Sequence, residues 1–245
     1  MGSAKELIVR VVPSKVATPF VKKHHYSGTV VNNSSLHFGV FFRGGLHGVM
    51  SFGPSLDKSK IQGLVAGTKW NEFLELNRMA FDDILPRNSE SRAISVALRL
   101  IRKNAPHIKW VVSFADGCQC GDGTIYRASG FVLTGASGGS MWRLPDDLAK
   151  INGAPVAHRM KVQDKSSALS RYILGQTFGK NLTMDEYVKR FGGEILDGKM
   201  LRYIYFLDPG CKNRLTVPII PFDRIDAIGA GMYKGKRMTR AERHK

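Results

Sequence analysis

The sequence predicts a mixed α/β protein, and three observations support this prediction. Two apolar runs, Leu36–Phe42 and Leu46–Phe52, flank Arg43-Gly44-Gly45, which is typical of a β-hairpin. One apolar stripe at helical spacing predicts an amphipathic helix over Glu90–Lys103, and the apolar run Ile108–Phe114 that follows predicts a buried strand. A hairpin that leads into alternating strands and helices indicates a sheet covered by helices.

The remaining elements of the first half follow from local patterns. Leu7–Val12 is a short β-branched run that Pro13 ends, so we expect a strand there. Ser14 is the expected cap of a helix over Lys15–Lys23. Residues 53–69 are rich in Gly and Ser and indicate a loop. Three further segments complete this half: Phe73–Phe81 as a strand in preference to a helix, Thr124–Ser129 as a short helix and Phe131–Thr134 as a strand.

The second half divides into an insertion, one more strand and a basic end. Residues 140–198 are expected to form a helical insertion with helices over Ser167–Phe178 and Met184–Phe191. Thr183 and Glu186 have the spacing of a capping box at the start of the second helix. Met200–Leu207 is a strand with aromatic character, and three prolines keep the segment after it irregular. The expected domains are a core of 1–139 plus 199–215, the insertion 140–198 and an irregular basic extension 216–245.

The composition bounds the class of protein. Hydrophobic residues make up 43% of the 245 residues, so the chain can bury a core and is not a disordered basic tail. No run approaches the length of a membrane span, and the N-terminus lacks a signal-peptide pattern, so we expect a cytoplasmic protein with no membrane partner. Three cysteines, an odd and low count, fit a reducing compartment. Cys118 and Cys120 form a C-x-C pair that we interpret as incidental thiols rather than a metal site.

The charge points to a polyanion. The chain carries 37 Lys and Arg against 20 Asp and Glu, a net charge of +17, and nucleic acid is the usual partner of such a surplus. The alternative is a solvated surface that only aids solubility. Basic residues concentrate in residues 1–137 and 199–245, whereas 138–198 is nearly neutral. The expected DNA-binding residues, which would contact phosphates without reading sequence, are Lys22, Lys23, Lys234, Lys236, Arg237, Arg240 and Arg243.

An ordered set of short motifs connects the first half of the chain to a known family. His25-Tyr26-Ser27-Gly28 follows the first helix, and Ser113-Phe114-Ala115-Asp116 ends a strand shortly before Ile125-Tyr126. Leu76-Asn77-Arg78 and Ser89-Glu90-Ser91-Arg92 lie between them. In this order the set resembles the phage Mom DNA-modification proteins, a divergent branch of the acetyltransferase-like (GNAT) superfamily. The resemblance covers roughly residues 5–137 and the strand near 200–208, and leaves the insertion and the basic end unaccounted for.

The resemblance implies a function and a set of site residues. It implies that a carbamoylmethyl group is added to the exocyclic amino group of adenine in double-stranded DNA, which protects phage DNA from host restriction in the bacterial cytoplasm. It also implies iron as a cofactor and a departure from ordinary acyl-CoA chemistry, with the donor of the transferred group unknown. His25, Tyr26 and Asp116 would be the metal or catalytic cluster, and Arg78, Ser91 and Tyr126 would line the same site.

The residue types allow these roles but leave alternatives open. His25 could instead belong to a phosphate-binding cluster with Lys22 and Lys23, although His, Tyr and a carboxylate also suit iron. Asp116 could act as a general base, hold a metal or cap a turn. Tyr126 could be a general acid, a stacking surface for an extruded base, or a core aromatic. Arg78 needs a partner in its apolar stretch, and the options are Glu75, Asp82 or an anionic ligand.

Ser91 lies at a helix start, where free backbone N–H groups favour an anion. Acetyltransferases place a glycine-rich turn there to hold the CoA pyrophosphate, but residues 87–92 contain no glycine. This makes acetyl-CoA doubtful as the donor. The other histidines, His37, His47, His107 and His158, show no ligand spacing, and we expect them to be structural.

Two functions compete with adenine modification, for which the target base would have to be flipped out of the duplex. One is a conventional acyl-CoA-dependent N-acetyltransferase that acts on a protein or a small amine, against which the glycine-free stretch argues. The other is a non-enzymatic DNA-binding protein, in which Asp116 and the His25-Tyr26 pair would have no catalytic task. The oligomeric state does not follow from the sequence.

Overall fold

The computed structural model describes residues 3–118, 121–138, 141–196, 198–227, 232–233 and 236–237. Contacts divide the chain into two compact units, which we describe separately. The first unit comprises Met1–Ala115, Gly123–Gly135 and Leu201–Phe222, and the second comprises Asp116–Asp122, Ala136–Met200 and Asp223–Lys245. No helix in the described ranges combines the length and apolar character that crossing a membrane requires.

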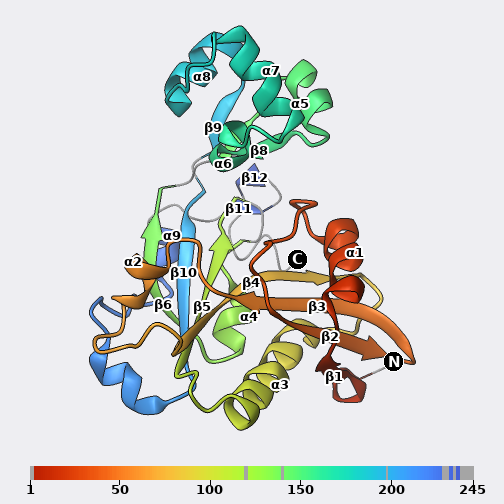
Figure 1. The fold of residues 1–245 in the computed structure, drawn as a ribbon, viewed down its shortest axis with the longest axis vertical. Coiled ribbons are helices and arrows are strands. Elements are labelled where there is room, and N and C mark those ends of the chain that lie inside the picture. Colours follow the sequence, from red (N-terminus) through yellow and green to blue (C-terminus); the bar gives the residue numbers. More distant parts are fainter. Residues whose placement is uncertain are drawn as a thin grey trace. The chain divides into compact units, whose positions relative to one another are not determined.

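A seven-stranded sheet organises the fold, with strand order β1-β2-β3-β4-β5-β10-β6 (Figure 1). β1 to β4 pair antiparallel with their neighbours, whereas β4 and β5 pair parallel. The predicted mixed α/β class is therefore confirmed. The strands are β1 (Ile8–Val11), β2 (Leu36–Phe42), β3 (Gly45–Gly53), β4 (Phe73–Phe81), β5 (Trp110–Asp116), β6 (Val132–Ser137) and β10 (Met200–Phe206).

The hairpin of β2 and β3 forms where the two glycines predicted it. Arg43 and Gly44 take positive φ values of 49° and 85°, which is the backbone that a tight two-residue hairpin turn requires. Few non-glycine residues among those described have a positive φ, and Arg43 is one of them. The turn therefore carries local backbone strain at Arg43, whose side chain is exposed.

The helices of the first unit lie close to their expected positions, with two corrections. α3 (Ser89–Asn104) is the crossover between the parallel strands β4 and β5, and it buries the predicted apolar stripe. Ser14 does not cap α1 (Ser14–His24): it is the first helical residue, and Pro13 stands at the cap position without a side-chain bond. The segment 53–69 is not all loop, because Asp57 caps α2 (Lys58–Gln62). α4 (Thr124–Ala128) and two 3₁₀ turns, η1 (Ala4–Glu6) and η2 (Pro209–Arg214), complete this unit.

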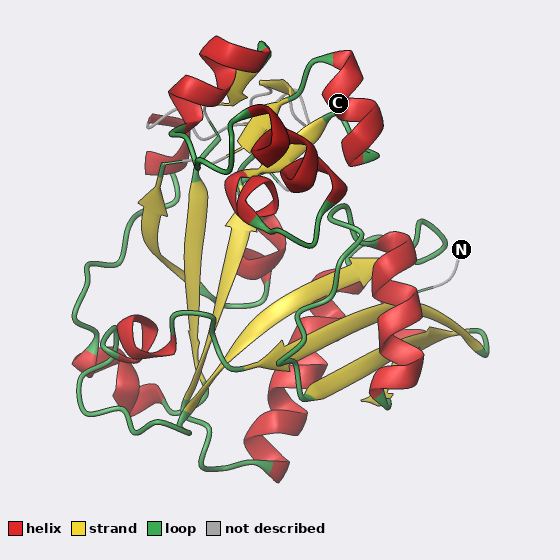
Figure 2. Ribbon diagram, turned by 45° about the horizontal axis from the view of Figure 1, so that its top comes forward, coloured by secondary structure: helices red, strands yellow, loops and turns green. Residues whose placement is uncertain are grey.

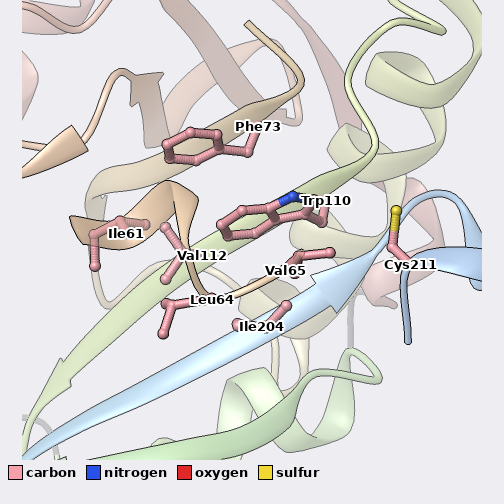
Figure 3. Close-up of a cluster of buried hydrophobic side chains, with 8 residues drawn as sticks. All are labelled: Ile61, Leu64, Val65, Phe73, Trp110, Val112, Ile204 and Cys211. Atoms are coloured by element: carbon pink, nitrogen blue, oxygen red, sulfur yellow. The ribbon is translucent and has the colours of Figure 1, made fainter. Parts of the chain in front are cut away.

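Two apolar clusters hold the helices to the sheet. Val21 and Ala17 of α1 pack with Val49 of β3 and Ala80 of β4, which fixes the helix that leads into the candidate site. Figure 2 shows the strands and helices of the fold by their secondary structure. A larger cluster joins α2, β4, β5, β10 and η2, and in it the rings of Phe73 and Trp110 stack at 4.6 Å (Figure 3). Its buried members are Ile61, Leu64, Val65, Phe73, Trp110, Val112, Ile204 and Cys211.

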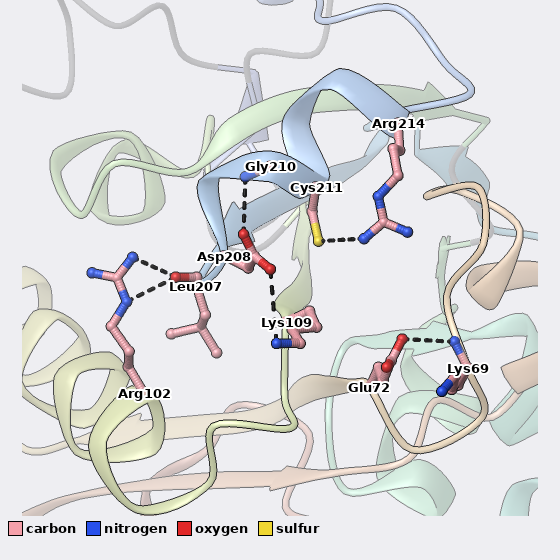
Figure 4. Close-up of polar contacts among 9 residues, drawn as sticks. All are labelled: Lys69, Glu72, Arg102, Lys109, Leu207, Asp208, Gly210, Cys211 and Arg214. Carbon is pink, nitrogen blue, oxygen red and sulfur yellow. Dashed lines mark hydrogen bonds and ion pairs between the residues drawn. The ribbon is translucent and has the colours of Figure 1, made fainter.

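Polar contacts fasten α3 to the end of β10. The guanidinium of Arg102 donates to the carbonyl oxygen of Leu207, and Lys109 pairs with Asp208 at 3.7 Å (Figure 4). Asp208 also accepts the backbone N–H of Gly210 at 3.0 Å, and Arg214 contacts the buried Cys211 sulfur at 3.0 Å. Arg102 and Arg214 therefore have structural partners, and part of the positive charge of the chain is engaged in holding the fold.

The second unit contains the segment predicted as a helical insertion, and it also contains a small sheet that was not predicted. The strands of this sheet are three residues each, too short for a period to be recognised in the sequence. Thr183 and Glu186 form both bonds of the expected capping box. Between residues 141 and 196 the second unit contains β7 (Met141–Arg143), α5 (Asp146–Asn152), β8 (Val156–His158), α6 (Arg159–Gln163), α7 (Ala168–Gln176), α8 (Met184–Phe191) and β9 (Glu194–Leu196).

The final segment is not entirely irregular. It contains a short helix, α9 (Arg224–Ala227), and an antiparallel pair, β11 (Met232–Tyr233) and β12 (Lys236–Arg237). Of the expected DNA-binding residues, Lys234, Arg240 and Arg243 lie outside the described residues, as do the side chains of Lys236 and Arg237.

Candidate functional site

The loop after α1 positions His25 and Tyr26. The helix ends at His24, and His25 takes an extended backbone while its N–H still bonds the carbonyl of Val21. Gly28, at φ +62°, closes the turn and donates its N–H to the carbonyl of His25 at 2.8 Å. As a result the imidazole of His25 and the ring of Tyr26 stack, with centroids 4.3 Å apart and planes inclined by 30°.

Arg78 of β4 joins this loop to the sheet. Its Nε donates to the carbonyl of Thr29 at 3.1 Å and its Nη1 to the carbonyl of Asn77 at 2.8 Å. Burial lowers the pKa of Arg78, while Tyr26 and Glu75 act in the opposite direction. Arg78 thus has two backbone carbonyls as hydrogen-bond partners, and Glu75 and Tyr26 interact with it electrostatically.

Asp82, the other acidic partner considered for Arg78, pairs with His47 instead, at 2.8 Å. His37 contacts the hydroxyl of Ser51 at 2.8 Å. His47 and His37, both expected to be structural, therefore have protein partners. Neither histidine takes part in the loop after α1.

Burial and the neighbouring guanidinium set the charge state of this region. Burial, and after it Arg78, lower the pKa of His25 to about 4, so its imidazole is neutral at physiological pH. Burial raises the pKa of Glu75, although Ser55, Asn77 and Arg78 each oppose that change. The region, which we call the Tyr26 region and define as His25, Tyr26, Glu75 and Arg78, therefore presents a neutral imidazole stacked on a tyrosine ring beside a guanidinium.

The contacts of His25 leave one ring nitrogen for a ligand. Nδ1 of His25 accepts the N–H of Ser27 at 3.1 Å and lies 2.8 Å from the Ser27 hydroxyl, so Nε2 is the nitrogen that could face an ion. The guanidinium of Arg78 acts on the same ring as a competing cation. Within the described ranges, no three His, Cys, Asp or Glu side chains gather closely enough to hold a metal. Iron stays a prediction of the sequence.

Asp116 ends β5 and belongs to the second unit. It is 6% exposed, and its carboxylate accepts the N–H of Cys118 at 2.9 Å. Asp116 also acts on His158 of β8, where it opposes the lowering of the pKa that burial causes and Arg159 reinforces. The turn-capping role considered for Asp116 is thus present, and a histidine accompanies it.

His158 is a residue that sequence reasoning missed. It was expected to be only structural because it shows no ligand spacing in the sequence. In the structure it lies on β8, where it is paired with Met141 of β7. Met141 packs with Cys118 and Leu196 in a small buried cluster. Cys118 is thus a buried packing residue, and Cys120 lies outside the described residues.

Tyr126 is a buried aromatic. It is 6% exposed, and its ring packs against Tyr203 at 5.2 Å and against Phe131 at 5.4 Å. Gly123, at φ +69°, allows this packing, because a Cβ there would lie 2.6 Å from the ring of Tyr203. A ring so enclosed cannot serve as the surface for an extruded base, whereas Tyr26, at 53% exposed, can.

Ser91 lines a cavity of about 910 Å³ at the start of α3, which we call the α3 pocket. Its hydroxyl donates to the carbonyl of Asn88 at 3.2 Å, in the first turn of the helix. Among the described residues, four cationic side chains and no carboxylate line the pocket, so it suits an anion. They come from three separate segments: Lys5, Arg43, Arg87 and Arg92.

Lys22 and Lys23 are exposed in the last turn of α1. Cations at that end of a helix also stabilise it through the helix dipole, so their presence has a structural reason besides DNA binding. Their exposure leaves both roles available.

These features define a mixed α/β protein with an aromatic and cationic loop and a separate anion-binding pocket. The model of the Mom protein family matches residues 6–224, and the chain belongs to this family. All six predicted catalytic and metal-binding residues lie within the matched range.

Known proteins with similarity to the chain are of two kinds. The chain is 42% identical over 142 residues to the methylcarbamoylase Mom of Escherichia phage Mu, which is 58% of each chain. An acetyltransferase from Bacillus subtilis in complex with CoA has a TM-score of 0.45 and 9% identity, over 82% of this chain and 98% of that one. The spermidine/spermine N-acetyltransferase SpeG from Vibrio cholerae has a TM-score of 0.44 and 8% identity, over 86% and 98%.

Proposed function

We propose that the protein transfers a carbamoylmethyl group to the exocyclic amino group of adenine in double-stranded DNA and thereby protects phage DNA from restriction. The observation that carries this proposal is family membership over residues 6–224, together with the phage Mu relative that is named a methylcarbamoylase. The net charge of +17 supports DNA as the partner. We place the protein in the cytoplasm of the bacterial host, where phage DNA is exposed to restriction enzymes.

The chemistry requires a proton acceptor and a bound donor. The amino nitrogen of adenine forms a bond to the transferred carbon and loses one proton, while the donor leaves with the electron pair of the bond that breaks. We assign the proton to the carboxylate of Asp116, whose neighbour His158 can share it. We assign the α3 pocket to a phosphate-bearing donor, because its lining is cationic.

Exposed lysines hold the duplex without reading its sequence. Lys22 and Lys23 on α1 are the described residues to which we assign this task. The target amine lies within the base stack, so the adenine must leave the duplex before it reacts.

A conventional acyl-CoA-dependent acetyltransferase is the second candidate, and the cationic α3 pocket is the observation that favours it. The stretch Arg87–Arg92 opposes it, because without glycine the backbone cannot approach a pyrophosphate as closely. Calorimetric titration with acetyl-CoA separates the two candidates: micromolar binding together with acetylation of peptide amines supports the acetyltransferase.

Mass spectrometry of nucleosides tests the proposal. Plasmid DNA is isolated from cells that express the wild type, Asp116→Asn or no protein, and its nucleosides are compared. We expect a carbamoylmethylated adenine only with the wild type, since removal of a general base typically lowers a rate by about 10²–10⁴-fold. Unmodified adenine in cells that contain folded wild-type protein contradicts the proposal, and equal modification by Asp116→Asn removes Asp116 from its role.

A further inference from the structure

We propose that Tyr26, backed by the ring of His25 and flanked by Arg78, is the surface on which an unpaired nucleobase stacks. The inference rests on the proposed function, in which that base is the extruded adenine. It reassigns two residues of the expected metal cluster, His25 and Tyr26, to binding of the base.

The exposure of Tyr26 is the first observation. The ring is 53% exposed, whereas the rings of Tyr126 and Tyr203 are buried, with exposures of 6% and 0%. An exposed aromatic ring forgoes the stabilisation that burial of its apolar surface would bring. Every nucleobase has a π-face, and stacking on an aromatic side chain is the usual way in which proteins hold unpaired bases.

The rigidity of the stack is the second observation. His25 lies 4.3 Å behind the Tyr26 ring, and its Nδ1 is held by the N–H of Ser27 at 3.1 Å and lies 2.8 Å from the Ser27 hydroxyl. The His25 ring therefore has a fixed orientation, and the Tyr26 ring is stacked on it before any ligand arrives. A preformed surface costs little conformational entropy when a base binds.

The position of Arg78 is the third observation. Its Nε and Nη1 donate to the carbonyls of Thr29 and Asn77, which holds the guanidinium beside Tyr26. Among the described residues, Nη2 makes no hydrogen bond. A fixed guanidinium with an N–H group to spare can donate to the acceptor edge of a base or to its phosphate.

The alternative use of these residues, as metal ligands, requires different atoms. A metal would bind a ring nitrogen of His25, whereas a base stacks on the face of the Tyr26 ring, which His25 backs and Arg78 flanks. The two uses also differ in what they require of Tyr26. A ligand must be the phenolate oxygen, but a stacking surface needs only the ring.

Affinity for a single base measures the contribution of the ring. The full-length protein is titrated with a short strand of abasic linkers that carries one adenine, and with the same strand without a base, so that the phosphate contacts cancel. We expect the wild type to bind the strand with adenine roughly 5- to 150-fold more tightly. Tyr26→Phe keeps this ratio, and Tyr26→Ser brings it close to one. Tyr172→Ser, which removes a 41% exposed tyrosine of α7, is the matched control and keeps the ratio.

Three results overturn the inference: a wild-type ratio of one, a ratio that Tyr26→Ser retains, and a loss in Tyr26→Phe as large as in Tyr26→Ser. Thermal unfolding of each variant confirms that it is folded. The readout requires no chemistry, so it separates this inference from the proposed function. A base-dependent ratio in a protein that leaves plasmid adenine unmodified supports the stacking surface and contradicts the proposed function.

Discussion

The Tyr26 region and the α3 pocket, both in the first unit, differ in the ligand chemistry that they offer. The Tyr26 region has two stacked rings and one guanidinium, which is held by backbone carbonyls. Within the described residues, the α3 pocket has four cations in a cavity of about 910 Å³, and its one aromatic lining residue is Phe42. A planar base suits the first and a phosphate suits the second. Under the proposed function, recognition of the base and binding of an anionic donor are therefore separate tasks of different residues.

The largest expected effect comes from the α3 pocket, and it distinguishes binding of the donor from binding of DNA phosphates. The double variant Arg87→Gln/Arg92→Gln should lower adenine modification about a hundredfold or more, because it removes the charge-assisted bonds that we expect both arginines to make to the proposed anionic donor. The slope of the logarithm of DNA affinity against the logarithm of salt concentration should stay unchanged. If that slope becomes shallower by about 2, the pocket contacts two DNA phosphates and its assignment to the donor is wrong.

The next effect concerns how Arg78 anchors the loop after α1, which carries Tyr26. Arg78→Lys should reduce modification about tenfold, because an ammonium cannot bond the carbonyls of Thr29 and Asn77 in the same fork geometry. Modification is measured by nucleoside mass spectrometry. Arg99→Lys, an exposed arginine of α3, is the matched control. Wild-type activity in Arg78→Lys would mean that the loop is positioned without this side chain.

A smaller effect concerns stability and pH. The folded state lowers the pKa of His25 from 6.5 to about 4, so between these values the unfolded chain binds more protons and stability falls as the pH falls. Between pH 7 and pH 5 the wild type should lose ~2 kcal/mol of unfolding free energy that His25→Gln does not lose. Urea unfolding at both pH values measures this difference. The exposed His107→Gln should behave as the wild type, and parallel curves for wild type and His25→Gln would contradict the burial of a neutral imidazole.

The smallest effect concerns the second unit. Phe178 follows α7 at φ 51° and is 89% exposed, in a position that helices usually give to glycine. Phe178→Gly should raise the unfolding free energy by about 1 kcal/mol, whereas Phe178→Ala removes the ring but keeps the strain. Thermal unfolding compares the two variants. Equal stability of both would show that the left-handed backbone costs nothing here.

Local patterns in the sequence were sufficient for most of the fold. The glycine turn at Gly44, the apolar stripe of α3 and the capping box of Thr183 each depend on residues a few positions apart. The elements that were missed, such as α2 and β7, are three to five residues long, so they are too short to show a period. Their formation depends on packing against distant segments rather than on their own pattern.

The candidate site was predicted less completely, since it depends on tertiary contacts. The motif order identified Tyr26 and Tyr126 alike, but only packing against Tyr203 decides that Tyr126 is buried. The same holds for His158, whose place beside Asp116 follows from the pairing of β7 with β8. No local signal in the sequence distinguishes the two tyrosines.

Modification of plasmid adenine by the Tyr26 variants tests the central claim, that this family member modifies adenine in DNA and holds the base on the Tyr26 ring. The nucleosides of plasmids from cells that express the wild type, Tyr26→Phe or Tyr26→Ser are compared by mass spectrometry. The account predicts a carbamoylmethylated adenine with the wild type and with Tyr26→Phe, and at least tenfold less of it with Tyr26→Ser. Modification of another base, or equal amounts of modified adenine with Tyr26→Ser and the wild type, would contradict it.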